Sequence, residues 1–252
     1  MNSNRLTPPT THLPTHADWR SGATRTEQLV WIYGLIVFVL GIFLAIFNTP
    51  YFDNTYTLED GLLEWLSAFA LGTTSFVCVQ RLILHRNAYT LQQHLIIGLT
   101  ALLFLFGAGE EISWGQRLLG ITSPDFFEMN NIQGETNLHN LMIGETKVNK
   151  LIFGKLLAVG FLIYLGLLTP LHRRSGNVAA LLNAWAVPIP TRLQWWGYIG
   201  IILGVEGAIH VFSETPKRGE LTECATSLVV MLTVLYPANR SIFEPKHNKA
   251  AS

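Results

Sequence analysis

The chain has 252 residues, of which 49% are hydrophobic and only 13% are charged. Ordinary soluble domains carry about 25% charged residues, so this composition excludes a typical water-soluble domain and indicates one membrane-embedded domain. Basic and acidic residues balance at 17 each, without the basic surplus of nucleic-acid-binding proteins, and we expect no nucleic-acid partner.

Six apolar stretches are long enough to cross a bilayer, since a helix needs about 20 apolar residues to span about 30 Å of hydrocarbon. In chain order they are residues 29–47, 61–80, 95–113, 151–171, 193–212 and 220–236. We therefore predict an all-α fold, a polytopic membrane bundle of about six transmembrane helices. Residues 1–28 are expected to form a disordered tail and residues 237–252 a C-terminal tail. A shorter apolar run, residues 178–190, suits either a re-entrant or an interfacial segment.

The distribution of basic residues predicts the orientation, because cytoplasmic loops of membrane proteins carry an excess of Lys and Arg. With a cytoplasmic N-terminus, the inner segments hold eleven of these residues and the outer segments hold five. We expect both termini to be cytoplasmic, with a lipid bilayer surrounding the helices.

Acidic residues open the second predicted span. Asp60 and Glu64 are four residues apart, which on a helix places them on one face. The helix dipole favours acids in the first turn of a helix. These two acids therefore either cap the helix N-terminus at the membrane interface or belong to a polar site.

Two adjacent acids, Glu110 and Glu111, lie at the C-terminus of a predicted helix instead of at an N-terminus. They fall at the C-terminal end of the third predicted span, where the helix dipole disfavours negative charge. Arg117, a bound cation or protonation would have to stabilise them. The alternatives are a functional site and a structural pairing of Glu with Arg.

The longest loop, residues 121–149, is expected to be functional because loops of this length are uncommon in compact domains. Ser123 as N-cap, followed by Pro124 at the first helical position, predicts a short helix that lies in the membrane interface. Its apolar face would consist of Phe126, Phe127 and Met129. Hydrogen-bonding side chains follow it: Asn131, Gln133, Glu135, Asn137, His139 and Asn140.

The fifth predicted span pairs Glu206 with His210 at a spacing of four, by which a helix offers two ligands to one metal or holds a carboxylate–imidazole pair. A separate stripe of small residues on the same helix predicts close packing against another helix: Gly197, Gly200, Gly204 and Gly207. Because both faces of this helix would then have a role, we expect it to be central in the bundle. The alternative is a Glu–His hydrogen bond that serves packing alone.

These groups together predict a polar site near the outer surface, to which Glu223 would also contribute. The catalytic candidates are Glu110, Glu111, His139, Glu206 and His210. A divalent metal is one interpretation of the carboxylates and imidazoles, with Glu64, Glu110, Glu206 and His210 as ligands. The candidates for substrate binding are Arg117, Asn137, Asn140, Lys217 and Arg218. Motifs for zinc peptidases, serine hydrolases and nucleotide binding are missing from the sequence.

The strings GEEISWGQRLLG (residues 109–120) and GETNLHNL (residues 134–141) resemble those of an uncharacterised family of bacterial multi-pass membrane proteins. This resemblance implies an inner-membrane location and carries no activity.

Three functions remain open at this stage. The first is an intramembrane enzyme, metal-dependent or acid–base, acting on a lipid or lipid-linked substrate. The second is a cation- or proton-coupled transporter or channel, which requires a polar path continuing inward. The third is a non-catalytic partner subunit within the membrane.

Overall fold

The computed structural model of the protein describes residues 24–144, 146–148 and 156–243. Most of the tail predicted at residues 1–28 and the last nine residues of the chain lie outside these ranges. The described chain is helical apart from a two-stranded antiparallel ladder, in which Met142 pairs with Lys147 and Ile143 with Thr146. The strands are β1 (Met142–Ile143) and β2 (Thr146–Lys147). The all-α class is therefore confirmed.

Four helices are long and apolar enough to cross a membrane. They are α1 (Arg25–Phe47), α3 (Leu62–Leu84), α4 (Leu91–Glu111) and a continuous helix over Arg192–Phe212. The last consists of α10 (Arg192–Ile202), the π-helix η5 (Leu203–Ile209) and α11 (His210–Phe212). These helices agree with four of the predicted spans to within about four residues at each end, and they make the chain a multi-pass membrane protein.

The two remaining predicted spans are also helical, but they are not among these four candidates. Residues 151–171 correspond to α7 (Leu157–Ile163), the π-helix η4 (Tyr164–Leu168) and α8 (Thr169–Arg174), with residues 151–155 outside the described part. Residues 220–236 correspond to α12 (Arg218–Leu235), whose beginning carries Arg218, Glu220 and Glu223. These charges lower the mean hydropathy of α12, so length and composition alone do not identify this helix as a membrane span.

Helix α12 is the centre of the bundle. It packs against α1, α3 and α10, and from Leu221 onward its residues are buried or half-buried on every side. A helix surrounded on all faces belongs to the interior of a bundle. The prediction that the helix over residues 193–212 would be central is therefore wrong, since that helix exposes large apolar side chains such as Trp196 and Leu203.

The small-residue stripe on that outer helix packs closely at two of its four positions. A Cβ at Gly197 would lie 2.4 Å from the indole of Trp31, and one at Gly204 would lie 2.8 Å from Phe38, both on α1. Gly200 and Gly207 meet nothing within 4 Å. The stripe thus brings α10 and η5 against α1, and at Gly197 it also faces α12, where an added Cβ would lie 3.5 Å from Val229.

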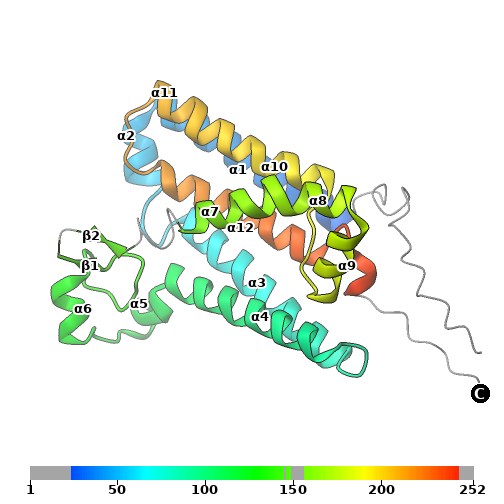
Figure 1. Ribbon diagram of the computed structural model, residues 1–252. Coiled ribbons are helices and arrows are strands. Elements are labelled where there is room, and N and C mark those ends of the chain that lie inside the picture. Colours follow the sequence, from blue (N-terminus) through cyan, green and yellow to red (C-terminus); the bar gives the residue numbers. More distant parts are fainter. Residues whose placement is uncertain (1–23, 145, 149–155, 244–252) are drawn as a thin grey trace, which may run out of the picture.

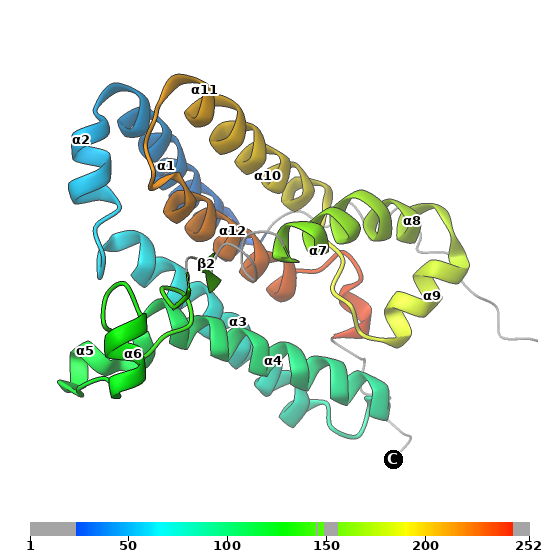
Figure 2. The same cartoon turned by 60° about the vertical axis from the view of Figure 1, so that its left-hand side comes forward.

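The connections gather at two opposite ends of the bundle (Figures 1 and 2). One end, called the acidic end, holds α2 (Thr49–Tyr51), the π-helix η1 (Phe52–Tyr56), residues 112–144 and residues 213–217. The other, called the basic end, holds residues 85–90, α9 (Gly176–Ala184) and the 3₁₀ turn η6 (Arg240–Ile242). The apolar run at residues 178–190 thus begins in a short helix at the basic end and continues, after a turn at Trp185 and Ala186, in chain without regular secondary structure through Pro188 and Pro190.

Side chains from neighbouring helices satisfy the C-terminus of α12 at the basic end. Arg81 of α3 is buried and donates from Nη1 to the carbonyl of Val234 at 2.7 Å and from Nη2 to that of Leu235 at 3.2 Å. Gln194 of α10 donates from Nε2 to the carbonyls of Leu232 and Tyr236, both at 3.1 Å. The last turn of a helix leaves its carbonyls without intrahelical donors, and these two side chains supply them.

Candidate functional site at the acidic end

A sharp reversal follows α4 and begins the segment of residues 112–144, called the hood. Ser113, Trp114 and Gly115 are consecutive left-handed residues, with φ of 47°, 56° and 72°. Left-handed backbone costs energy at residues other than glycine and persists only where surrounding contacts hold it. Here the reversal folds the Trp114 indole back onto Gly109, where an added Cβ would lie 2.8 Å from three ring atoms.

The carboxylate of Glu110 is the anchor of the hood. It accepts hydrogen bonds from Trp114 Nε1 at 3.0 Å, from the backbone N–H of Leu138 at 2.6 Å and from that of His139 at 3.1 Å. Glu110 is buried, and these three donors replace the water that a carboxylate needs. They also offset the unfavourable interaction of this carboxylate with the C-terminal end of the helix dipole. From the sequence, Arg117, a cation or a proton was expected to do so.

Polar side chains fill the interior of the hood. The Ser113 hydroxyl donates to a carboxylate oxygen of Glu135, and Asn137 Nδ2 donates to Ser113 Oγ at 2.7 Å. Asn131 Nδ2 donates to the Asn137 side-chain oxygen at 2.9 Å, and that oxygen also accepts from the backbone N–H of Asn140 at 3.0 Å. The predicted binding residues Asn137 and Asn140 are therefore committed to holding the hood together.

Arg117 joins the hood to the start of α3. Its Nε lies 3.0 Å from Glu135 Oε1, and its Nη1 lies 2.8 Å from Asp60 Oδ2. Asp60 precedes α3 in a left-handed conformation, with φ of 58°, and its backbone N–H donates to Glu64 Oε2 at 2.6 Å. The expectation that Asp60 and Glu64 share a helix face is thus wrong, because Asp60 lies before the helix begins.

Four glutamates from three helices form what we call the carboxylate cluster: Glu64 of α3, Glu111 of α4, and Glu220 and Glu223 of α12. Glu111 interacts electrostatically with the other three and with Glu110. His139 of the hood lies beside the cluster, with Nε2 3.8 Å from Glu223 Oε2. Among the side chains that the structure describes, no Lys or Arg nitrogen lies within 4.0 Å of a carboxylate oxygen of Glu111, Glu220 or Glu223, although Lys217 interacts electrostatically with Glu220.

The chemical consequence of this arrangement is proton sharing. Neighbouring carboxylates repel one another when all are ionised, so a proton bound by one of them can be exchanged with the others. An imidazole close to such a group can exchange that proton, because its charge changes near neutral pH. The cluster therefore has the chemistry of an acid–base site.

The structure does not bring Glu206 and His210 into this cluster. Both side chains are exposed, while their neighbours Val205 and Ile209 carry the buried face of η5. The nearest charged contact of Glu206 is Arg218, whose Nε lies 3.9 Å from its Oε1. The spacing of four does place Glu206 and His210 on one face, but this face points outward, away from the bundle.

The predicted metal ligands, Glu64, Glu110, Glu206 and His210, are consequently not arranged around a common point. Within residues 24–144, 146–148 and 156–243, no group of three or more His, Cys, Asp and Glu side chains is placed to hold a metal ion. Glu110 is occupied by hydrogen-bond donors, and the other three lie on separate elements. The donor set of the described chain does not fit the predicted metal centre.

The predicted cationic binding residues make contacts within the protein. Lys217 Nζ donates to the carbonyl of Thr57 at 3.3 Å, which ties the start of α12 to the segment before α3. Arg117 and Arg218 contact carboxylates, as described above. Sequence reasoning missed Glu220 as a member of the cluster, although its spacing of three from Glu223 places both on one face of α12.

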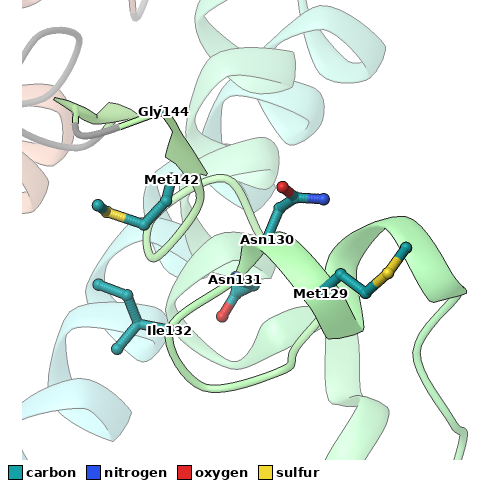
Figure 3. Close-up of a pocket in the computed structure, with 6 residues that line it drawn as sticks. All are labelled: Met129, Asn130, Asn131, Ile132, Met142 and Gly144. Carbon is teal, nitrogen blue, oxygen red and sulfur yellow. The ribbon is translucent and has the colours of Figure 1, made fainter.

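A shallow pocket of about 280 Å³ opens on the hood (Figure 3). It is lined by Met129, Asn130, Asn131, Ile132, Met142 and Gly144. This lining holds no acid, base or nucleophile, so the pocket offers contact surface rather than chemistry.

The chain matches no protein-family model, no curated protein and no solved structure. The family resemblance of residues 109–120 and 134–141 therefore stays a prediction, and the functional argument depends on the geometry of the site.

Proposed function

We propose that this chain is a multi-pass membrane enzyme that uses the carboxylate cluster and His139 as acid and base on a lipid or lipid-linked substrate. The observation that carries the proposal is the meeting of four glutamates from three helices beside one histidine. No Lys or Arg whose side chain the structure describes forms an ion pair with Glu111, Glu220 or Glu223. Acids within membrane-spanning helices are costly, and such groups usually mark functional sites.

In this proposal Glu111 and Glu223 share the proton that is transferred, and His139 exchanges it with the reacting group. Positioned proton donors and acceptors of this kind accelerate reactions by about 10²–10⁴-fold. Arg117, Lys217 and Arg218 are candidates to attract a phosphate on the substrate, since they lie on the elements that border the cluster. No step is assigned to a metal, because the described donors do not fit one.

A proton- or cation-coupled transporter is the principal alternative, and it requires polar groups that continue from the cluster through the bundle. Three of the four hydroxyls on α3 are instead bonded to backbone carbonyls. Ser67 and Thr74 donate to the carbonyls of Leu63 and Ala70 four residues earlier, and Ser75 donates to Ala101 on α4. These committed hydroxyls favour a site that opens at one end over a path through the molecule.

Turnover by purified protein in liposomes tests the proposal. Liposomes would be supplied with single classes of phospholipid, glycolipid or polyprenyl-linked lipid, and products would be identified by mass spectrometry. We expect conversion of at least one class, slowed about 100-fold or more by Glu111→Gln and by Glu223→Gln. The matched control is Glu214→Gln, an exposed acid at the same end of the bundle, which should leave turnover unchanged.

The outcomes separate the three functions. Ion-gradient-driven uptake without conversion of any lipid would favour the transporter. Substitutions that lower the free energy of unfolding, with no conversion or uptake by the parent protein, would favour a non-catalytic subunit. Conversion that survives both glutamate substitutions would disprove the assigned acid–base residues.

A further inference from the structure

The hood has its polarity reversed relative to a water-soluble structure. Several of its polar side chains are inside: Ser113 and Asn137 are exposed by only 1% and 3%, and Glu135 by 8%. Its large apolar side chains are outside: Leu119 is 70% exposed, Met129 is 77% and Ile143 is 66%. Water-soluble proteins bury such apolar groups and expose charged ones, so water is not the solvent to which this surface is matched.

The apolar side chains of the hood point in several directions. Figure 3 shows Met129 directed to the opposite side from Ile132 and Met142. Further exposed apolar residues come from α5 (Gln116–Leu119), the segment after it and α6 (Asp125–Asn130): Leu118, Leu119, Ile121 and Phe126. A docked protein would cover one face, whereas a fluid apolar solvent contacts all of them.

This apolar surface is continuous with the surface of a membrane span. Leu102, Leu103 and Leu105 are exposed on α4, and the exposed Trp114 and Leu118 follow directly after that helix ends. The apolar surface that α4 presents to the bilayer therefore extends into the hood.

We propose that the hood is inserted into the boundary between headgroups and acyl chains of the membrane leaflet at the acidic end, with lipid as its occupant. Its charges limit how deep it lies. Asp125 and Glu128 are exposed on α6, so this helix reaches headgroup depth and not the hydrocarbon centre. The proposal concerns the membrane contact alone and does not depend on the enzymatic function.

Depth measurement by spin labelling in liposomes tests this proposal. Single cysteines would replace Leu119, Met129 and Ile143 in the full chain, in a background with Cys78→Ala and Cys224→Ala, since both native cysteines are buried and free. We expect nitroxides at these three positions to collide more often with oxygen, which concentrates in lipid, than with a water-soluble nickel chelate. Labels at Asp125→Cys and Glu128→Cys are the controls on α6 and should show the reverse preference.

Two results would overturn the proposal. Preference for the nickel chelate at Leu119, Met129 and Ile143 would place the hood in water, and shielding from both reagents would mean that protein covers it. A measurement on the unaltered chain guards against variants that fail to fold. Photolabelling with a diazirine-bearing phospholipid should modify peptides within residues 116–132, and modification confined to the long helices would contradict lipid insertion.

Discussion

Gly109 is the residue that allows the chain to reverse after α4. Its missing side chain leaves room for the Trp114 indole, and that contact holds the Trp114 Nε1 donor at Glu110. We predict that Gly109→Ala lowers the free energy of unfolding by about 1–3 kcal/mol, because a Cβ 2.8 Å from the ring forces the indole away. Equilibrium unfolding in mixed detergent micelles measures this change.

Gly72→Ala is the matched control, since a Cβ at this glycine in α3 meets nothing within 4 Å. Alanine there should leave stability unchanged or raise it by up to about 1 kcal/mol through helix propensity. Repeating Gly109→Ala in a Trp114→Ala background should abolish most of its cost, because the clashing ring is gone. A cost that persists in that background would mean that the glycine acts through the backbone and not through the indole.

Glu110 shows which features of a single residue could be predicted from the sequence and which could not. An acid at a helix C-terminus requires a stabilising partner, and this need was visible from the pattern alone. The partners were not, because two of the three are backbone N–H groups of Leu138 and His139, nearly thirty residues away. Side-chain identity identifies candidate ion pairs such as Arg117, but it carries no signal for which distant backbone groups approach a carboxylate.

At the level of elements, α12 depends on side chains that lie on other helices. Arg81 satisfies two of its terminal carbonyls and lies 4.7 Å from the ring centre of Phe243. We predict that Arg81→Ala lowers the free energy of unfolding by about 2–4 kcal/mol, because buried carbonyls lose charged donors. Arg81→Lys should recover only part of this loss, since an ammonium cannot reproduce the planar fork.

The same unfolding measurement in detergent micelles checks this prediction, with Arg86→Ala as control. Arg86 is exposed in the turn after α3, and its removal should change the free energy of unfolding by less than about 0.5 kcal/mol. Equal effects at Arg81 and Arg86 would show that the basic residues act through net charge at this end and not through the capping contacts.

Helix positions were largely predictable, while their packing was not. Hydropathy located α1, α3, α4 and the helix over Arg192–Phe212, because crossing a bilayer imposes a minimum apolar length on each. It did not identify α12 as the centre, since a helix surrounded by protein and one surrounded by lipid have similar compositions. Hydropathy also did not reveal the π-helix η5 or the outward direction of Glu206 and His210.

Local rules were also overridden within the hood. Ser123 was expected to cap α6, but the residue at the cap position is Pro124, and the Ser123 hydroxyl donates to the carbonyl of Gly134. The short helix itself lies close to its predicted position. Hydrogen bonds across the hood thus decided the role of Ser123, because a network of several partners outweighs a single capping bond.

For the whole molecule, charge is divided between the two ends of the bundle. The basic end carries Arg81 in the last turn of α3 and Arg86 just after this helix, Arg173 and Arg174 at the end of α8, and Arg192 at the start of α10. Glutamates dominate the opposite end, where the carboxylate cluster lies. Because positively charged loops are retained in the cytoplasm, this division supports the proposal that the basic end and both termini are cytoplasmic.

Labelling of single cysteines in intact cells tests this orientation. Glu214→Cys lies in the connection before α12 at the acidic end, and Asn87→Cys lies in the turn between α3 and α4 at the basic end; both positions are exposed. In a background without the two buried cysteines, a membrane-impermeant maleimide should label position 214 from outside, and position 87 only after the cells are opened. The reverse pattern would place the carboxylate cluster and the hood on the cytoplasmic side, and any substrate would then have to come from the inner leaflet. Labelling of both positions in intact cells would mean that the helices between them do not separate the two ends across the bilayer.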